Sequence, residues 1–523
     1  MTVRDLSISV PRQRRVLSVL VFAAVLIWID TTILGIALER IADPRTGLGA
    51  TPGELQWAVG SYALVFATVL FAAGALGDRY GHRTILVLGL LCFGAASVWA
   101  AESQHLVGGA TGLILARGLM GLGGAMMMPT SMAIIGATFP PERRAGAIAA
   151  WSASSGVGVA LGPLLGGVLV DHFWWGSVFL VNLPVVALAL IGVAVAVPNP
   201  KLAQRRRPDP VGLALSTAGL ALLAYGLIEA GQDTDWGRLR VWGPVALGLA
   251  LLALFTVFEW RSPEPSFDPR LFRNGRFSAG NLALAALFFG ITGQMFYGNF
   301  YLQGARGMSA LDTGLAFLPG AIGVAAGSPL GARLARRFGV GLVSGVGLLV
   351  VAAGFLANLA FDIDTPLVYF CTVGFVSGIA MGLAIAPTVA AVIAVLPLDR
   401  MGAGSAVNNT VRQVGSVLGI ALLGTILTVT YRDRIEPSLA SLPAAARDAA
   451  SPSAEHTRAV AEALHRPDLA DAANHAFITA MHVTAASAAV VAFLGAVLLM
   501  LAFRTRRSQA AAQRPEPALA GRP

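Results

Sequence analysis

The sequence is poor in charged residues, in cysteine and in lysine, and each shortage excludes a class of protein. Charged side chains make up 12% of the 523 residues, which is about half the share that soluble proteins carry. Cys92 and Cys371 lie in different apolar runs without CxxC spacing, so neither a disulfide framework nor a redox motif is expected. Lys201 is the only lysine and lies in a polar linker, which leaves no G-x-x-x-x-G-K-[ST] loop for an ATP-driven pump.

Apolar residues and glycine are abundant instead. Hydrophobic side chains account for 56% of the chain, the mean hydropathy is +0.71, and 60 residues are glycine, which lets helices approach closely in lipid. This composition predicts an all-α polytopic membrane protein surrounded by the lipid bilayer. The net charge of +9 comes from short basic clusters between the apolar runs. Such clusters follow the positive-inside rule of membrane proteins, so no nucleic acid partner is expected.

Apolar runs of about 20 residues, each long enough to cross the ~30 Å hydrocarbon core, occur about fourteen times. Arginine clusters fall on alternate loops, on the same side as the two ends of the chain. Both termini are therefore expected in the cytoplasm, and the chain is expected to be a multi-pass protein of the cell (inner or plasma) membrane. The predicted spans are 16–38, 54–76, 83–102, 109–133, 144–169, 176–198, 210–230, 241–260, 277–302, 312–335, 340–360, 366–396, 403–430 and 477–503.

Two polar linkers, 199–209 and 261–276, divide the chain. The motif GALGDRYGHR at 74–83 recurs weakly as GARLARRFGV at 331–340, which favours two related halves with a cargo cavity between them. The long loop 431–476 is expected to form short external helices. The predicted domains are a six-helix N-terminal half (1–198), a linker with two inserted membrane helices (199–276), a six-helix C-terminal half containing that loop (277–503) and a cytoplasmic tail (504–523).

One carboxylate, Asp30, lies inside the first apolar run, Val19 to Leu38. A charge at the centre of a membrane helix costs on the order of 2.5–3.5 kcal/mol, and burial favours the neutral, protonated form of a carboxyl group. Asp30 is therefore a candidate to bind and release a proton as its surroundings open to one side or the other. The alternative is a structural acid that a neighbouring polar group holds in place.

An arginine lies inside the fourth predicted span, in the sequence RGLMGLGGA that runs from Arg117 to Ala125. Arg117 and Asp30 lie at similar depths, about eight residues from the same membrane face. We therefore expect an ion pair or a short polar relay, which would ease the burial of both charges. Alternatively, the Arg117 side chain extends to the membrane interface.

Residues 74–83 predict a tight turn on the basic side of the membrane. Gly74 and Gly81 allow unusual backbone angles, Asp78 offers an acceptor near a helix start, and Arg79 and Arg83 mark the cytoplasmic side. The simplest alternative is a well-capped turn without a role in gating.

The fifth span contains small residues at a spacing of four and a proline. Small residues at this spacing form a smooth face for close helix packing, and the proline bends the helix. The residues concerned are Gly158, Gly162, Pro163, Gly166 and Gly167.

Candidate residues for the cargo cavity come from several spans. Asn408 and Arg412, and likewise Asn409 and Gln413, are spaced i, i+4, so that polar faces look into the bundle. The aromatic stretch 288–301 suits stacking on a flat or cationic drug, although aromatic residues at helical spacing also form cores and interface belts. The predicted cavity residues are Trp28, Asn182, Gln294, Phe296, Tyr297, Asn299, Asn408, Asn409, Arg412 and Gln413.

Three of these motifs resemble signatures of the major facilitator superfamily. Residues 74–83 resemble its loop signature G-x-L-a-D-R-x-G-r-k. Residues 117–125 resemble its fourth-span motif R-x-x-q-G-x-g-a, with Met120 in place of the usual glutamine. Residues 158–167 resemble G-x-x-x-G-P-x-x-G-G, the motif associated with exporters of the superfamily rather than importers.

The first span points to one branch of that superfamily. Residues 29–38 resemble L-D-x-T-V-V-N-V-A-L-P of the fourteen-span drug:proton antiporters (EmrB/QacA type), with Gly35 in place of the asparagine and Glu39 in place of the proline. Residues 173–184 and 404–415 are also similar to that branch, so that the resemblance covers essentially the whole membrane part.

The resemblance implies the major facilitator fold, with two six-helix halves and two inserted helices. It implies that Gly74, Asp78, Arg79, Gly81 and Arg83 form a conformational latch. Asp78 would engage the start of the thirteenth span, near Met401 to Gly404, in the outward-open state. The motif at 158–167 would mark an exporter.

Asp30 and the resemblance together predict a proton-coupled antiporter that exports lipophilic, often cationic drugs, such as quaternary ammonium compounds and dyes, by alternating access. Asp30 and Arg117 would couple the proton to the cargo. Such a protein is a secondary active transporter and not an enzyme; it uses no cofactor or metal, because the proton gradient drives it, and it is expected to be a monomer. The alternatives are an exporter of one endogenous metabolite, lipid or self-made antibiotic, and a membrane sensor or scaffold without flux.

Overall fold

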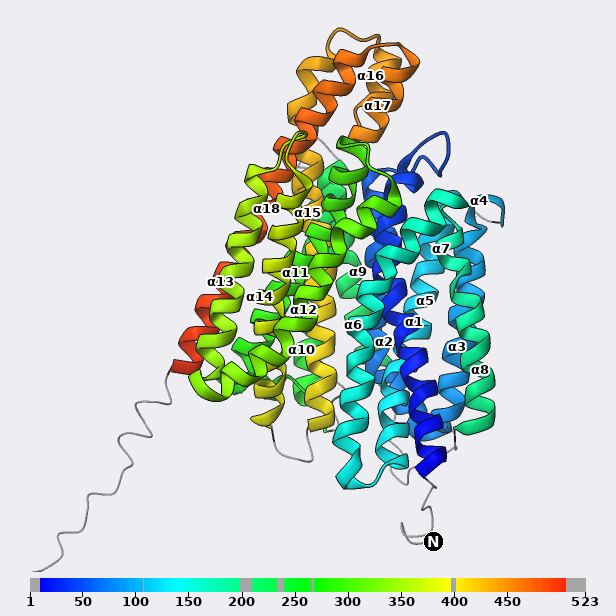
Figure 1. Cartoon of the computed structure of the whole chain (residues 1–523), viewed down its shortest axis with the longest axis vertical. Helices are drawn as coiled ribbons and strands as arrows, with labels where there is room; N and C mark the ends of the chain where they lie inside the picture. Colours follow the sequence, from blue (N-terminus) through cyan, green and yellow to red (C-terminus); the bar gives the residue numbers. More distant parts are fainter. Residues whose placement is uncertain are drawn as a thin grey trace, which may run out of the picture.

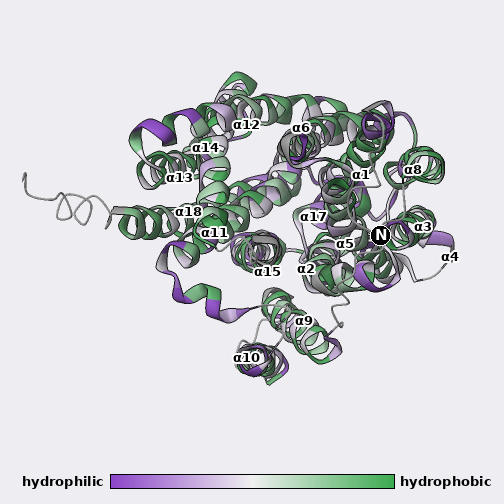
Figure 2. Cartoon of the chain, turned by 90° about the horizontal axis from the view of Figure 1, so that it is seen from below, coloured by the Kyte–Doolittle hydropathy of each residue, from purple (hydrophilic) through white to green (hydrophobic). Residues whose placement is uncertain are grey.

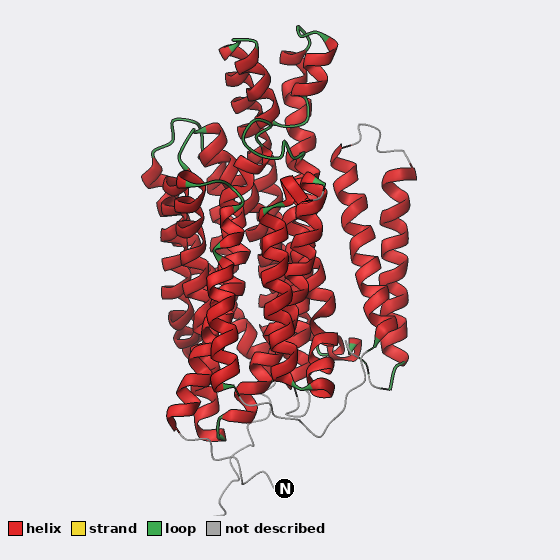
Figure 3. Cartoon of the chain, turned by 90° about the vertical axis from the view of Figure 1, so that its right-hand side faces the viewer, coloured by secondary structure: helices red, strands yellow, loops and turns green. Residues whose placement is uncertain are grey.

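The computed structural model describes residues 10–106, 108–197, 209–232, 239–263, 265, 268–396 and 401–504. Most of the predicted linker 199–209 and nearly all of the predicted tail 504–523 lie outside these residues. Every regular element of the described residues is a helix (Figure 3). Helices satisfy all backbone hydrogen bonds within one segment, which is what a chain in lipid requires. The all-α polytopic architecture predicted from the composition is confirmed.

The helices form two groups with a helix pair beside them. The first group contains α1 (Val10–Ala42), α2 (Pro52–Tyr80), α3 (His82–Ala101), α4 (Ser103–Leu106), α5 (Gly109–Thr138), α6 (Pro141–His172), α7 (Ser177–Leu180) and α8 (Asn182–Ala196). The pair is α9 (Pro210–Gln232) and α10 (Leu239–Arg261). The second group contains η1 (Pro269–Arg273), α11 (Gly275–Asn299), η2 (Phe300–Ala305), α12 (Ala310–Phe338), α13 (Val340–Ala357), η3 (Asn358–Ala360), α14 (Leu367–Ala394), α15 (Met401–Leu439), α16 (Ala444–Ala450), α17 (Ala454–Ala463) and α18 (Pro467–Arg504).

Seen along the bundle, the two groups lie side by side (Figure 2). The helices α1, α3, α5 and α8 are on one side, and α13, α14 and α18 are on the other. Contacts between the groups run through α6 with α12 and through α2 with α15. The helices α9 and α10 pack on each other at one edge of the bundle, where α9 also contacts α2 and α15 (Figure 2).

Within the described residues, twelve helices are long and apolar enough to cross a membrane, and the bent helix α2 makes a thirteenth when it is taken as one span. In α6 the apolar part is the shorter stretch Gly156–His172. Each predicted span falls on one helix or on a run of consecutive helices, but the count of about fourteen stays a prediction.

The predicted loop 431–476 is helical for most of its length. The helix α15 continues to Leu439, and α18 begins at Pro467, earlier than predicted. Between them lie the short helices α16 and α17, and the whole unit projects beyond the rest of the bundle at the end away from the N-terminus (Figure 1). The prediction of short helices in this loop is confirmed.

Residues 74–83 and 331–340 form the same kind of turn in the two groups. The turn between α2 and α3 consists of Gly81 alone, with φ +99°, and the turn between α12 and α13 consists of Gly339 alone, with φ +89°. Only glycine adopts such angles readily. The weak sequence repeat therefore corresponds to a repeated turn in the structure.

The two groups touch firmly at the end of the bundle away from the N-terminus. Asp171, near the end of α6, accepts hydrogen bonds from the backbone N–H groups of Ala310 (3.1 Å) and Leu311 (2.8 Å) at the start of α12. Gln303 of η2 donates to the carbonyl oxygen of Ile36 in α1 at 2.9 Å. These bonds hold that end of the bundle closed.

Glycine allows α3 and α5 to cross with their backbones in contact. A Cβ atom on Gly123 would lie 2.8 Å from the carbonyl oxygen of Gly89, and a Cβ on Gly89 would lie 2.9 Å from the carbonyl oxygen of Gly123. Neither position accepts a side chain unless the helices move apart. This crossing fixes α5, and with it Arg117, against the rest of the first group.

Gly123→Ala should lower the melting temperature of the detergent-purified protein, because overpacking such a crossing costs about 1–3 kcal/mol. Gly136→Ala on the same helix is the matched control, since no atom lies within 4 Å of its added Cβ. That control should leave the melting temperature unchanged or raise it, because alanine is the better helix former by ~1 kcal/mol. Equal shifts in the two variants would contradict the close crossing.

Candidate functional site

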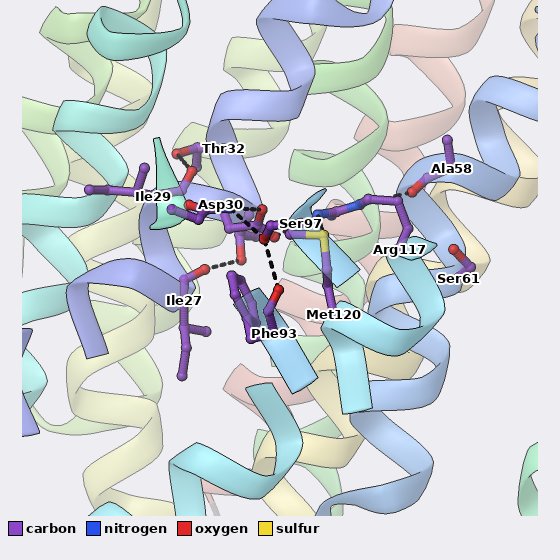
Figure 4. Close-up of polar contacts among 12 residues, drawn as sticks. Ile27, Ile29, Asp30, Thr32, Ala58, Ser61, Phe93, Ser97, Arg117 and Met120 are labelled. Carbon is purple, nitrogen blue, oxygen red and sulfur yellow. Dashed lines mark hydrogen bonds and ion pairs between the residues drawn. The ribbon is translucent and has the colours of Figure 1, made fainter. Parts of the chain in front are cut away.

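Asp30 of α1 and Arg117 of α5 form an ion pair inside the first group of helices (Figure 4). Arg117 Nη1 donates to Asp30 Oδ2 at 2.6 Å, and the two side chains are 2% and 0% exposed respectively. The pair predicted from their matching depths is confirmed, and Arg117 does not extend to the interface. Pairing replaces two isolated charges by one neutral unit, which lowers the cost of burying them.

The second carboxylate oxygen of Asp30 is also bound. Asn182, the first residue of α8, donates its Nδ2 to Asp30 Oδ1 at 3.3 Å and to Ser97 Oγ of α3 at 3.2 Å. Ser97 in turn donates to the carbonyl oxygen of Phe93 at 2.8 Å. Asp30 therefore belongs to a small polar network that joins α1, α3, α5 and α8.

Arg117 has three further contacts. Its Nε donates to the carbonyl oxygen of Ala58 in α2 at 3.2 Å, and its Cζ lies 4.6 Å from the centre of the Tyr62 ring. Its Nη1 lies 3.9 Å from Met120 Sδ, where the related motif has a glutamine. A thioether sulfur is only a weak acceptor, so Met120 offers no amide relay.

The network has two chemically distinct states. While Asp30 is ionised, it accepts hydrogen bonds from a guanidinium group and an amide, which suit a carboxylate. A proton on Asp30 would remove the charge that attracts Arg117. The guanidinium would then retain the Ala58 carbonyl and the face of Tyr62, which are favourable partners for a cation. A neutral side chain at position 30 would therefore weaken the contact between α1 and α5.

The small residues of α6 pack against α1 at the level of Asp30. Added Cβ atoms on Gly158, Gly162 and Gly166 would collide with Trp28, Thr32 and Ile33 of α1 respectively. The next face of α6 contacts the second group, because a Cβ on Gly167 would lie 2.7 Å from the carbonyl oxygen of Ala310, and a Cβ on Gly314 would collide with the carbonyl oxygen of Pro163. The motif at 158–167 therefore lies between α1 and α12.

The turn residues lie at the end of the bundle that holds the N-terminus. Arg83 donates to the carbonyl oxygen of Ala194 in α8 at 3.0 Å, and Arg79 Cζ lies 5.3 Å from the Tyr80 ring centre. Asp78 Oδ1 lies 3.2 Å from His82 Nε2. Gly74 faces Pro129 of α5, with 3.8 Å between its added Cβ and the proline Cβ, and Gly81 forms the turn itself.

The predicted partner of Asp78 is the start of α15, Met401 to Gly404. The side chains of residues 401–403 lie outside the described residues. The latch therefore stays a prediction.

Five of the predicted cargo residues keep part of their surface accessible. They are Trp28 on α1, Gln294 on α11, and Asn409, Arg412 and Gln413 on α15, all half-buried. On α15, Asn409 and Gln413 lie between the side that contacts α11 through Gly415 and the side that contacts α2 through Thr410. We call these five residues, together with Thr31 and Phe288 described below, the interior face.

The other five predicted cargo residues are buried in contacts between helices. Asn182 binds Asp30, as described, and Asn408 donates to Asn281 Oδ1 of α11 at 3.0 Å. Tyr297 accepts a hydrogen bond from Asn358 at 3.0 Å, and Phe296 packs edge-on against Phe300. Asn299 donates to the Met295 carbonyl oxygen. Four of these residues are held by hydrogen bonds, and Phe296 lines a cavity together with Phe300 and Tyr431. Their place in the cargo cavity therefore stays a prediction.

Sequence reasoning missed several residues of the site. Thr31 is exposed within α1 although it follows Asp30 directly, and helical spacing places it beside Trp28 and Gly35. Its spacing of three residues from Trp28 could have predicted that Thr31 lies on the same helix face. Tyr62 and Ser97 carried no such signal, because each contacts a residue far away in the chain. Phe288 belongs to the aromatic stretch that was predicted to stack on a drug. Phe288 of α11 lies under Arg412, with 4.2 Å from the guanidinium Cζ to the ring centre.

Gly35 explains one departure from the related first-span motif. A Cβ on Gly35 would lie 3.1 Å from Asn299 Nδ2 of α11. An asparagine side chain at position 35 would therefore need the space that Asn299 occupies. The amide group at this level comes from α11 instead of α1.

Residues 20–420 match the family model of the Major Facilitator Superfamily. The chain is 33% identical over 495 residues to the multidrug efflux pump LfrA of Mycolicibacterium smegmatis, an alignment that covers 93% of this chain and 96% of the relative. It is 30% identical over 502 residues to the tetracenomycin C resistance and export protein of Streptomyces glaucescens, with 93% and 90% coverage. It is 32% identical over 514 residues to the methyl viologen resistance protein SmvA of Salmonella typhimurium, with 96% and 99% coverage.

Solved structures match the fold. A bacterial homologue of the human lysosomal transporter Spinster, in an inward-facing and unoccupied conformation, superposes with a TM-score of 0.68 at 18% identity, covering 95% of this chain and all of that chain. A D-xylose-proton symporter superposes with a TM-score of 0.59 at 14% identity, covering 93% and 97%. At these identities the likeness concerns the fold alone.

Arg117→Met should lower the melting temperature of the purified protein strongly, because it leaves a buried carboxylate without its cation, a loss of about 3–5 kcal/mol. The double variant Asp30→Asn with Arg117→Met should be more stable than Arg117→Met alone, since neither charge then remains. A double-mutant cycle of melting temperatures measures this coupling. The corresponding cycle at Glu229 and Arg240 is the control, because Arg240 is 69% exposed and its 2.8 Å ion pair should contribute little. Additive effects at Asp30 and Arg117 would contradict the interpretation.

Proposed function

The chain belongs to the major facilitator superfamily and is a multi-pass membrane transporter of small molecules, and we propose that it is a proton-coupled antiporter that exports lipophilic, often cationic, drugs by alternating access. The observation that carries the proposal is the buried pair of Asp30 and Arg117. A membrane transporter has little reason to bury a carboxylate unless the charge is used, because an ionisable residue inside the bilayer is expensive.

The coupling step follows from the two states of the network. In the ionised state Arg117 and Asn182 hold Asp30, and α1 is drawn towards α5 and α8. A proton entering from the acidic side neutralises Asp30 and weakens that attraction, so that α1 is free to shift. Thr31 and Trp28, next to Asp30 on α1, move with it. Proton binding and cargo binding then compete through one helix.

Three observations support export and alternating access. The small-residue motif of α6 lies between α1 and α12, where a close and smooth contact allows the two groups to rock. The bonds of Asp171 and Gln303 close the end away from the N-terminus, as one of two alternating states requires. The relatives named above are an efflux pump, an export protein and a resistance protein.

The remaining assignments belong to the same proposal. The chain has two six-helix halves, at 1–198 and 277–503, and two inserted helices at 199–276, and its branch is the fourteen-span one. It acts as a monomer in the cell membrane with both termini in the cytoplasm, and it uses the proton gradient rather than a cofactor. The turn at 74–83 latches the cytoplasmic end when that end is closed.

A second candidate function is export of one specific endogenous compound, such as a self-made antibiotic. One relative, the tetracenomycin C resistance and export protein, is named for a single compound. A dedicated exporter should bind one compound tightly, whereas a multidrug exporter should bind several weakly.

The test uses inside-out membrane vesicles with an acidic interior and a dye that reports the pH gradient. Ethidium or rhodamine 123 should partly collapse the gradient in wild type and not in Asp30→Asn, because the amide cannot carry the proton. Glu229→Gln is the matched control, since its carboxylate pairs with Arg240 at the end of α9, away from the network. It should behave like wild type.

Two results would count against the proposal. Full coupling in Asp30→Asn would exclude Asp30 as the proton carrier. A folded, inserted wild type that responds to neither dye would favour the exporter of a single compound.

A further inference from the structure

Arg412 holds a positive charge on the interior face. It is the twelfth residue of α15, which places it ~16 Å from the start of that helix at 1.5 Å per residue. Its guanidinium Cζ lies 4.2 Å from the centre of the Phe288 ring of α11. The side chain is half-buried, so that it is deep in the bundle and still accessible.

Arg412 differs in its partners from two other arginines, the buried Arg117 and the half-buried Arg458. Arg117 pairs with Asp30, and Arg458 pairs with Glu455 at 3.1 Å. Among the described residues, Arg412 has no carboxylate partner within 4.0 Å, and its buried Nε has no hydrogen-bond acceptor. Within the described part of the chain, the Phe288 ring is the partner of its charge.

An aromatic ring compensates only part of such a charge. A cation over a ring face is attracted by the ring quadrupole, but the guanidinium group keeps five N–H donors that the ring does not satisfy. An unsatisfied charge in a membrane protein is expensive, so that its retention indicates a use. The natural complement of a guanidinium group is a carboxylate or another oxygen anion, which it binds with two parallel hydrogen bonds.

The neighbouring residues of the interior face are neutral. Asn409 and Gln413 flank Arg412 on α15, Gln294 comes from α11, and Trp28 and Thr31 come from α1. The nearest acid of α1, Asp30, points away from this face and is bound by Arg117 and Asn182. The described residues of the face thus combine amides, aromatic rings and a single positive charge.

We propose that Arg412 on the Phe288 ring is an anion-binding site, which selects cargo that carries a carboxylate or phenolate on an aromatic system. The ring system of the cargo stacks along Phe288 and Trp28, and its oxygen anion accepts hydrogen bonds from the guanidinium group. Amphoteric compounds, which carry an amine as well, remain compatible with the site. A purely cationic compound is disfavoured, because it meets a like charge in a region of low dielectric constant.

This inference rests on the proposed function, since it assumes that the interior face meets the cargo. It keeps proton-coupled export and changes the expected charge of the cargo from mainly cationic to anionic or amphoteric. The expected order of preference is anionic or amphoteric aromatic compounds first and quaternary cations last.

The experiment compares two dyes with the same xanthene ring system and opposite charge, fluorescein and rhodamine 123. Fluorescence anisotropy measures their binding to the purified full-length protein. Wild type should bind fluorescein at least tenfold more tightly than Arg412→Gln does. Rhodamine 123 should bind Arg412→Gln as well as wild type or more tightly, because a repulsive charge is removed.

Two further variants separate charge from packing. Arg412→Lys keeps the charge and should keep part of the preference for fluorescein, which also covers the case that Arg412→Gln does not fold. Arg337→Gln is the matched control, because Arg337 also lies over a phenylalanine ring, that of Phe338 at 5.3 Å, but at the exposed end of α12. It should change the binding of neither dye.

The outcomes distinguish this inference from the proposed function. Three results would overturn the inference. A folded Arg412→Gln variant could lose affinity for both dyes equally, or it could bind fluorescein as wild type does. The third result is that wild type does not bind fluorescein. Proton-coupled export of rhodamine 123 without binding of fluorescein would leave the proposed function intact and refute the anion site. Binding of fluorescein that depends on Arg412, in vesicles that export neither dye, would support the site and refute the proposed function.

Discussion

The neutralisation of charge away from water is the constraint on which the rest of the structure depends. Helices in lipid satisfy their own backbone groups, so that the side-chain charges are the main polar groups left to be compensated. Asp30 and Arg117 solve this by direct contact at 2.6 Å, and Glu229 and Arg240 do so at the edge of the helix pair. At the projecting end, Arg458 lies between Glu455 and Glu39, at 3.1 and 3.8 Å. Arg412 lies over the Phe288 ring and has no carboxylate within 4.0 Å among the described residues, so that it sets the character of the interior face.

Such contacts need helices that approach closely, and glycine provides the approach. The crossing of α3 and α5 at Gly89 and Gly123 brings backbone to backbone and so fixes the helix that carries Arg117. Gly158, Gly162 and Gly166 do the same between α6 and α1, the helix that carries Asp30. The high glycine content and the buried ion pair are therefore connected. An ion pair in lipid needs its two helices held in defined positions, and the glycine contacts hold them there.

The class, the helices, the short helices of residues 431–476 and the Asp30–Arg117 pair could be predicted, since each depends on local hydrophobicity or on depth within a span. The direction in which a polar side chain points could not be predicted from the sequence. Asn182 and Asn409 are both amides in spans, yet the first is buried against Asp30 and the second faces the interior. Their difference depends on which helix packs on which side, and that follows from contacts between distant segments. At position 35 the related motif has an asparagine and this chain has glycine. In the structure the side-chain amide at that level belongs to Asn299 of the other group.

In the proposed mechanism, α1 joins the proton site directly to the interior face. Asp30 points towards α5 and α8, while Thr31, the next residue, lies on the accessible side with Trp28 and Gly35. Any shift of α1 on loss of the Arg117 contact must therefore change the interior face directly. Coupling between distant sites requires an element with two discrete arrangements that both sites bias. In the proposed mechanism α1 is that element: it shifts relative to α5, while the glycine face of α6 keeps the two backbones close.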